Sequence, residues 1–275
     1  AEIRLEIRYR PTGALRRRLS DTATLYLDIV DYPGEWLLDL PLLDLDYRQW
    51  SAQVLGSLRD PALRELASPW LAHALSAEQP FDERIAAELA AAYTGFLHAC
   101  KERLGLSLIQ PGRFVLPGEY AGAPMLQFVP WAWNEPAPEV AQDSMYATLA
   151  HRYEQYKRHL VRGFYKEHFS GFDRQIVLVD CLQALNAGPG GFEDMRLAIA
   201  RIMQSFSYGS SNWWRRLFLP RIDRLLFVAS KADHVTPDQH YNLVSLLQHI
   251  VQGARGQARF EGVTTDCLAI AAVRA

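Results

Sequence analysis

The stretch LYLDIV (Leu25–Val30), followed at once by DYPG (Asp31–Gly34), decides the fold class of this chain. Its apolar first part predicts a strand, so Asp31–Gly34 places a D-x-x-G turn at the carboxyl end of that strand. Far downstream, LLFVA (Leu225–Ala229) predicts a second strand that runs into SKAD (Ser230–Asp233). Either turn alone is an ordinary turn or helix cap. Together, in this order, they are typical of guanine-nucleotide-binding proteins.

The residue types in the two turns fit nucleotide chemistry. Asp31 can hold a water molecule of a Mg²⁺ shell, because Mg²⁺ keeps most of its waters in proteins. Gly34 lets a backbone N–H approach a phosphate oxygen closely. Downstream, Asp233 can accept both N–H groups on the edge of guanine, and the stem of Lys231 can lie over the base. We therefore predict a metal and γ-phosphate turn at Asp31 and Gly34 and a base-reading turn at Ser230–Asp233.

Composition restricts the class of protein further. The chain has 275 residues, is 49% hydrophobic and carries a formal net charge of −2, which gives no general attraction to nucleic acid. Cys100, Cys181 and Cys267 form no C-x-x-C pair, which is typical of reduced thiols in the cytoplasm. The apolar stretch 114–133 is interrupted by prolines and a glutamate and predicts no membrane span. We expect a cytoplasmic protein that does not bind nucleic acid.

The order of elements predicts an α/β fold. Residues 3–9 and 25–30 predict an antiparallel hairpin, and strands at 175–180, 225–229 and 266–271 alternate with helices, as in a parallel sheet. A helix, a strand, a second helix and a second strand, joined by short loops, need only roughly 50–60 residues between the two motifs. We therefore expect a P-loop GTPase-like sheet with an antiparallel hairpin at one edge and a large helical insertion. Residues 1–45 and 171–275 would form a partial core, and 46–170 a helical insertion subdomain.

Several helices are predicted from apolar spacing and caps. They cover 61–75, 83–104 with Asp82 as N-cap, 144–169 and 193–206. The stretch Gly188–Gly191 predicts only a turn.

No G-x-x-x-x-G-K-[ST] motif occurs in the chain. Such a phosphate-binding loop normally follows the first, central strand and opens the first helix. The chain instead begins with Ala1 and goes straight into a strand. We expect a trimmed piece of a longer protein whose P-loop lies upstream.

Three longer stretches resemble the YcjX-like family of bacterial P-loop proteins, sometimes described as stress proteins. They are residues 27–41, 172–186 and 230–235. The resemblance implies a GTPase-like fold with a helical insertion, GTP or GDP with Mg²⁺ as ligands, and a C-terminal portion beyond this chain. It also implies pairing with a membrane protein encoded nearby, which would place the protein peripherally at the inner membrane.

The resemblance assigns roles to single residues. Asp31 and Gly34 match the Mg²⁺ and γ-phosphate turn, and Ser230, Lys231 and Asp233 match the base-reading motif, with Ser in place of the commoner Asn or Thr. Two further candidate residues follow from position: Glu35, where many GTPases carry a water-orienting Gln, and Ala272, where a backbone N–H meets the guanine carbonyl oxygen. An acid at position 35 repels phosphate, so a solvated turn residue is the alternative there.

These assignments leave three hypotheses open. In the first, the intact protein binds GTP with Mg²⁺ and hydrolyses it slowly as a stress-related switch, with Glu35 as the catalytic residue. In the second, it is a nucleotide-gated scaffold whose helical insertion binds a protein partner with negligible turnover. In the third, it is a pseudo-GTPase without a P-loop, which holds only if this chain is complete.

The chain on its own should bind nucleotide poorly. Removing a P-loop strand from the middle of the sheet leaves two unpaired strand edges and takes away the backbone cradle that holds phosphates. We expect residues 1–275 alone to aggregate or to show no tight GDP binding in calorimetry. A micromolar GDP affinity of this chain by itself would contradict an upstream phosphate site.

Overall fold

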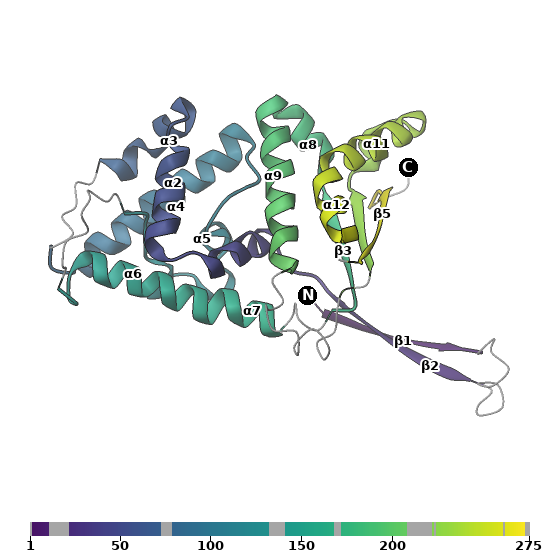
Figure 1. The fold of residues 1–275 in the computed structure, drawn as a ribbon, viewed down its shortest axis with the longest axis horizontal. Helices are drawn as coiled ribbons and strands as arrows, with labels where there is room; N and C mark the ends of the chain where they lie inside the picture. The colour runs from purple at the N-terminus through teal and green to yellow at the C-terminus, as the bar shows by residue number, and fades with distance from the viewer. Residues whose placement is uncertain are drawn as a thin grey trace. The chain divides into compact units, whose positions relative to one another are not determined.

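The computed structural model describes residues 2–10, 22–72, 79–131, 141–167, 172–207, 222, 224–260 and 262–272 (Figure 1). The chain divides into two compact units, Ala1–Gly34 and Glu35–Ala275. The first unit holds a two-stranded antiparallel sheet, and the second holds a three-stranded parallel sheet with many helices. The chain is thus an α/β protein.

The first unit is an amphipathic hairpin of β1 (Glu2–Tyr9) and β2 (Ala23–Val30), which confirms the predicted antiparallel pair. The register sets apolar residues directly opposite each other, as in the pairs Ile3–Ile29 and Leu5–Leu27. The opposite face carries the ion pair between Arg4 Nε and Asp28 Oδ1 at 2.5 Å. The apolar side chains remain exposed, and a lone hairpin is only marginally stable. The hairpin is therefore suited to pack against a further layer.

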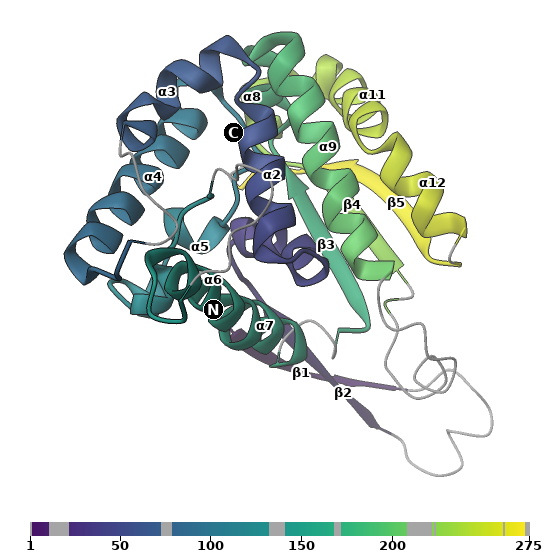
Figure 2. The same cartoon turned by 60° about the vertical axis from the view of Figure 1, so that its left-hand side comes forward.

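The parallel sheet has the order β3 (Arg174–Val179), β4 (Arg224–Ala229) and β5 (Thr264–Ala269). Its β3 and β4 strands confirm the predicted ones, and β5 begins two residues before its predicted start. One face packs Val179, Leu225 and Phe227 against four helices (Figures 1 and 2). These helices are α8 (Cys181–Asn186), α9 (Gly188–Ser207), α11 (His240–Ile250) and α12 (Gln252–Phe260).

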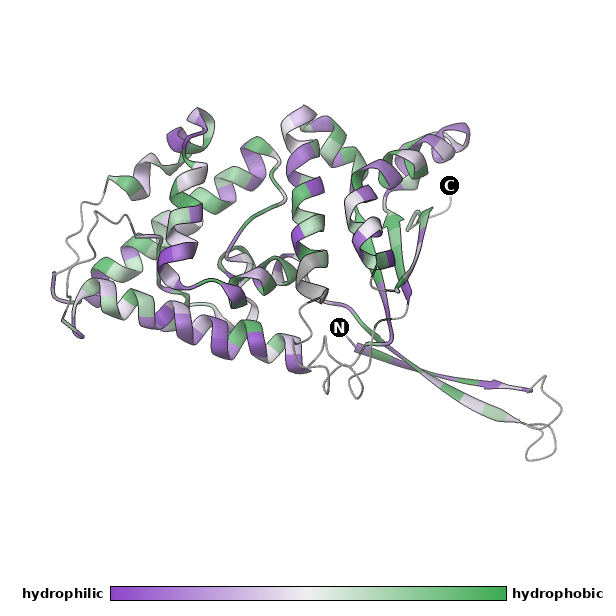
Figure 3. Ribbon diagram, viewed as in Figure 1, coloured by the Kyte–Doolittle hydropathy of each residue, from purple (hydrophilic) through white to green (hydrophobic). Residues whose placement is uncertain are grey.

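The other face of the parallel sheet is apolar and open at its two edge strands, whereas Val228 of the central strand is buried on it. Ile176 and Leu178 of β3 are 62% and 63% exposed, and Leu268 and Ile270 are 37% and 45% exposed. Figure 3 shows these strands in the green of hydrophobic residues. Parallel sheets are normally covered on both faces, because their strands are apolar on both sides. This face, like the hairpin, is built to pack against a further layer.

The segment after the hairpin is helical and has an aromatic core. Trp50 stacks on Tyr153 with ring centroids 5.2 Å apart and meets the ring of Phe128 edge-on at 5.3 Å. As predicted, Asp82 caps its long helix by accepting from the N–H groups of Arg84 and Ile85. The elements are η1 (Gly34–Asp44), α2 (Tyr47–Ser57), α3 (Pro61–Leu71), α4 (Glu83–Leu104), α5 (Gly112–Val115), η2 (Gly118–Tyr120), η3 (Pro124–Leu126), α6 (Met145–Gln155), η4 (Tyr156–Val161) and α7 (Arg162–Glu167).

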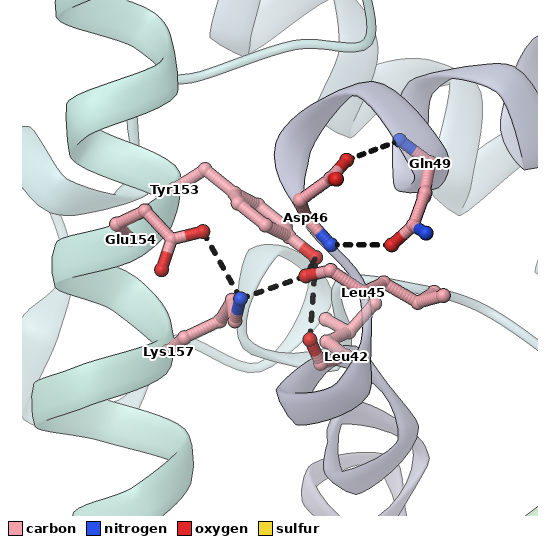
Figure 4. A network of polar contacts seen from close by, with 7 residues as sticks. All are labelled: Leu42, Leu45, Asp46, Gln49, Tyr153, Glu154 and Lys157. Carbon is pink, nitrogen blue, oxygen red and sulfur yellow. Dashed lines mark hydrogen bonds and ion pairs between the residues drawn. The ribbon is translucent and has the colours of Figure 1, made fainter.

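A polar network joins the end of η1 to the long helix α6–η4 (Figure 4). The hydroxyl of Tyr153 and the ammonium of Lys157 both donate to the carbonyl of Leu45, at 3.1 and 2.7 Å. Directly after it, Asp46 and Gln49 form a capping box that starts α2. The carbonyls at the end of η1 are thus satisfied by side chains of a helix over a hundred residues later. Because the second unit contains both this helical segment and the parallel sheet, a separate insertion subdomain at 46–170 stays a prediction.

Two local predictions differ from the structure. The turn predicted at Gly188–Gly191 is wrong, because these residues form the first turn of α9. Gly188 adopts a φ of +76° that suits glycine, and Pro189 is tolerated there because a first-turn N–H has no helical partner. The single regular helix predicted at 144–169 is interrupted by the π-helical turn η4, which apolar spacing does not reveal.

Gly112 tests how tightly the segment after the hairpin packs on the helices. A Cβ at Gly112 would overlap the backbone carbonyl of Glu35, whereas a Cβ at Gly95 on α4 meets nothing within 4 Å. We expect Gly112→Ala to lower the free energy of unfolding by roughly 1–3 kcal/mol. Gly95→Ala, the control, should raise it by about 0.5–1 kcal/mol. Urea unfolding of the full-length protein measures both, and equal effects would contradict the packing.

Candidate functional site

The base-reading turn predicted at Ser230–Asp233 lies across the carboxyl ends of all three parallel strands. The N–H of Ser230 donates to the carbonyl of Val179 at the end of β3, at 3.1 Å. The N–H of Ala232 donates to the carbonyl of Ile270, just after β5, at 3.0 Å. In open α/β sheets, ligands bind in the crevice beyond these strand ends. The turn therefore occupies the position that the sequence predicts for a ligand-binding element.

Lys231 has an unusual backbone. Its φ of +59° and ψ of +36° place it in the left-handed region, the only non-glycine residue of the described chain with a positive φ. A side chain in this region is strained by roughly 1–2 kcal/mol, and such strain tends to occur at functional sites. The backbone beyond it is braced by a hydrogen bond between His240 Nε2 and the carbonyl of Ala232, at 3.0 Å.

The ammonium of Lys231 is paired with Asp180, the residue that follows β3. Lys231 Nζ lies 2.5 Å from Asp180 Oδ2, and Asp180 Oδ1 accepts from the N–H of Gln183 to cap α8. Burial alone would raise the pKa of Asp180, but the hydrogen bonds from Lys231 and Gln183 lower it below its usual range. Asp180 is therefore a carboxylate that holds Lys231 above the end of β3. The sequence gave no sign of this pair.

The other predicted base-reading residues lie on the same edge of the sheet. Asp233 exposes its carboxylate, and His234 Nε2 lies 3.8 Å from Asp233 Oδ2. Ala272 is exposed and comes two residues after Ile270, whose carbonyl pairs with the turn. The second unit thus brings Ser230, Lys231 and Asp233 together at one edge of the sheet.

Asp31 and Gly34 belong to the other unit. They follow β2 at the end of the hairpin unit, and both are exposed. Their meeting with Ser230–Asp233 around one nucleotide stays a prediction. Among the described residues, no group of three His, Cys, Asp or Glu side chains could hold a metal ion. A Mg²⁺ ion held through phosphate oxygens and water needs only one carboxylate, so Asp31 fits that role by its donor chemistry.

Glu35, the predicted catalytic residue, is held by a helix of the second unit. Lys101 Nζ on α4 lies 2.6 Å from Glu35 Oε1, and both side chains are partly buried. Burial would raise the pKa of Glu35, but the hydrogen bond from Lys101 brings it below its usual value. Glu35 is thus ionised at neutral pH and paired with a cation. Its role in orienting a water molecule stays a prediction.

A buried carboxyl group at Asp39 was not singled out from the sequence. Asp39 is 1% exposed and accepts from the N–H of Gly112 at 2.7 Å, the N–H of Arg113 at 3.3 Å and the hydroxyl of Tyr156. The guanidinium of Arg113 lies 3.4 Å from the ring centre of Trp36. A lone acid inside the apolar run WLLDLPLL was the signal that could have found it. Asp39 ties the segment after the D-x-x-G turn to α5 and to the π-helical turn.

Comparison with known proteins shows the family of the chain. The model of the YcjX-like family, DUF463, matches residues 1–275, so the chain belongs to that family. It is 53% identical over 284 residues to a protein of Escherichia coli K12 named "Ras-like GTPase YcjX", covering 100% of this chain and 60% of the relative. A protein of the same name from Shewanella oneidensis is 45% identical, with 100% and 58% covered. The chain therefore spans about three-fifths of the length of these relatives.

None of the helices that the structure describes combines the length and the apolar character that crossing a bilayer requires.

Asp39 predicts a pH dependence of stability. Burial raises the pKa of Asp39 to about 7, above the roughly 3.9 of an unfolded chain. The protonated form of Asp39 stabilises the folded state. This stabilisation is fully present below the pKa that Asp39 has in the unfolded chain, and it is lost as pH rises through about 7. Between pH 4 and 8, the unfolding free energy of the full-length protein should fall relative to Asp39→Asn by about 4 kcal/mol at most. Urea unfolding across this range measures the difference, and parallel curves would contradict the buried acid.

Proposed function

We propose that this chain carries the base-reading half of a guanine-nucleotide site in a longer GTPase-like protein. The observation that carries the proposal is the Ser230–Asp233 turn, fixed across three strand ends with Lys231 in a left-handed conformation. The name "Ras-like GTPase" of relatives that are 53% and 45% identical supports the same class of ligand.

In this proposal each residue of the turn has a defined contact. The carboxylate of Asp233 accepts the two N–H groups on the edge of guanine, and the stem of Lys231 lies over the base while Asp180 holds its ammonium. Ser230 shapes the turn through its bond to Val179. The backbone N–H of Ala272 donates to the carbonyl oxygen of the base.

The phosphate half of the site uses Asp31 and Gly34. Asp31 holds a water of the Mg²⁺ shell, and the N–H of Gly34 contacts the γ-phosphate. The chain has no G-x-x-x-x-G-K-[ST] motif, so the main phosphate loop belongs to another part of the longer protein. Two observations support a longer sheet: the relatives extend well beyond the matched region, and the outer face of β3–β5 is apolar and exposed.

Turnover separates the main proposal from the scaffold alternative. Hydrolysis needs a residue that orients the attacking water, and Glu35 is the candidate by position. The ion pair of Glu35 with Lys101 favours the alternative, because it commits the carboxylate to α4. In the scaffold reading, the same pair links the nucleotide turn to the helical segment, which binds a protein partner. A stress-related role, a location in the cytoplasm and association with an inner-membrane partner all stay predictions.

A substitution of Asp233 that changes which base the turn matches tests the proposal. Asp233→Asn replaces one of the two carboxylate acceptors for guanine by an amide donor and so matches xanthine, whose edge offers an oxygen where guanine has an amino group. We expect the full-length variant to lose GDP affinity by roughly 30-fold to 1,000-fold and to prefer xanthosine diphosphate, as measured by calorimetry.

The control is Asp238→Asn, which changes an exposed acid of the short helix η7 (Pro237–Gln239) outside the turn. It should bind GDP as the wild type does. If Asp233→Asn keeps its preference for GDP over xanthosine diphosphate, the base-reading role of Asp233 is wrong.

A further inference from the structure

One end of the chain between α4 and α5 is held by a carboxyl group of α9. We call residues 105–113 the bridge, since they run from the end of α4 to the first turn of α5. The N–H groups of Ser107 and Leu108 both donate to Asp194 Oδ2 of α9, at 2.5 and 3.0 Å. A Cβ at Gly105 would lie only 2.9 Å from the Cβ of Ala187, the residue between α8 and α9. The bridge therefore meets α9 through hydrogen bonds and through close packing at the start of that helix.

The other end of the bridge is held by residues that follow the D-x-x-G turn. The N–H groups of Gly112 and Arg113 donate to the buried carboxyl group of Asp39, at 2.7 and 3.3 Å. A Cβ at Gly112 would lie 2.0 Å from the backbone carbonyl oxygen of Glu35. There is thus no room for even a methyl group between residues 35–39 and this end of the bridge.

The middle of the bridge is fixed as well. Ile109 and Pro111 are buried. The side-chain amide of Gln110 donates to the carbonyl of Leu38, and its own carbonyl accepts from the hydroxyl of Tyr93 on α4 at 3.2 Å. Closely packed chain of this kind transmits a displacement, because it has no free space in which to absorb it. A shift at one end of the bridge should therefore reach the other end.

We propose that the bridge couples the residues that follow the D-x-x-G turn to α9. Asp39 and Asp194 each accept from two successive N–H groups, which fixes the direction as well as the distance of each end of the bridge. A displacement of residues 35–39 then reaches the helices on the parallel sheet through the helical segment. Asp194 is a positioning residue in this device. The coupling stands by itself, and only its dependence on the nucleotide rests on the proposed function, because Glu35 directly follows Gly34.

Amide hydrogen exchange in the full-length protein without nucleotide tests the coupling. Asp194→Ala should speed exchange at residues 107–108 by roughly 10-fold to 100-fold, the effect of losing their acceptor. At residues 112–113, the far end of the bridge, it should speed exchange by roughly twofold to 30-fold. Glu193→Ala, the control, removes an exposed acid of the same helix and should change neither rate by more than about twofold.

A variant at the opposite end tests the same coupling in the reverse direction. Asp39→Asn keeps the shape of the side chain, turns one of its two acceptors into a donor and should speed exchange at both ends of the bridge. Unchanged exchange in β4 shows in each case that the fold is retained. If both variants speed exchange only at their own end, or if Glu193→Ala acts as Asp194→Ala does, the coupling is wrong.

The same measurement with GDP and with a non-hydrolysable GTP analogue tests the dependence on the nucleotide. Replacing one by the other should change the exchange rate at residues 107–108 in the wild type. Asp39→Asn should bind both nucleotides and lose this change. Binding of both nucleotides by the wild type without any change at residues 107–108 would contradict the role of the bridge alone, whereas no binding of either would contradict the proposed function.

Discussion

The candidate site depends on two backbone hydrogen bonds that fix the turn after β4 to its neighbouring strands. One runs from Ser230 to the carbonyl of Val179, and the other from Ala232 to the carbonyl of Ile270. Because both neighbours are parallel strands, the turn is forced to the edge where all three strands end. This constraint holds Lys231 in its left-handed conformation and directs its ammonium to Asp180. The positions of the side chains in the site follow from it.

A second constraint acts on the chain that follows the D-x-x-G turn. Glu35 is paired with Lys101, and Asp39 is buried among donors from α5 and the π-helical turn. These contacts attach residues 35–39 firmly to the helical segment. If Gly34 responds to a γ-phosphate, as we propose, the first element that could register the change is this attachment. The helical segment would then be the readout of the nucleotide state, in the switch and in the scaffold hypotheses alike.

The sequence predicts much of the fold because strong local patterns govern it. Apolar runs at strands β3 and β4 and the Asp82 cap of α4 are local signals, and the structure confirms them. The start of α9 was missed because Gly188–Gly191 has the composition of a turn, and only a left-handed glycine and a first-turn proline allow a helix there. The π-helical turn at Tyr156 was missed because apolar spacing does not distinguish it from a regular helix, and the contact of Tyr156 with Asp39 lies between residues far apart in the sequence.

The base-reading residues could be predicted because their motif is contiguous and lies at a strand end, and their role stays a prediction. Their supports were not found, since Asp180 is fifty-one positions before Lys231 and Lys101 is sixty-six after Glu35, and one sequence cannot reveal such pairs. The most direct test of the account compares GDP with ADP in calorimetric titrations of the full-length protein. The two ligands share their phosphates and differ only in the base. The account predicts that GDP binds at least about 30-fold more tightly, the effect of the two hydrogen bonds at Asp233; equal affinities would contradict it.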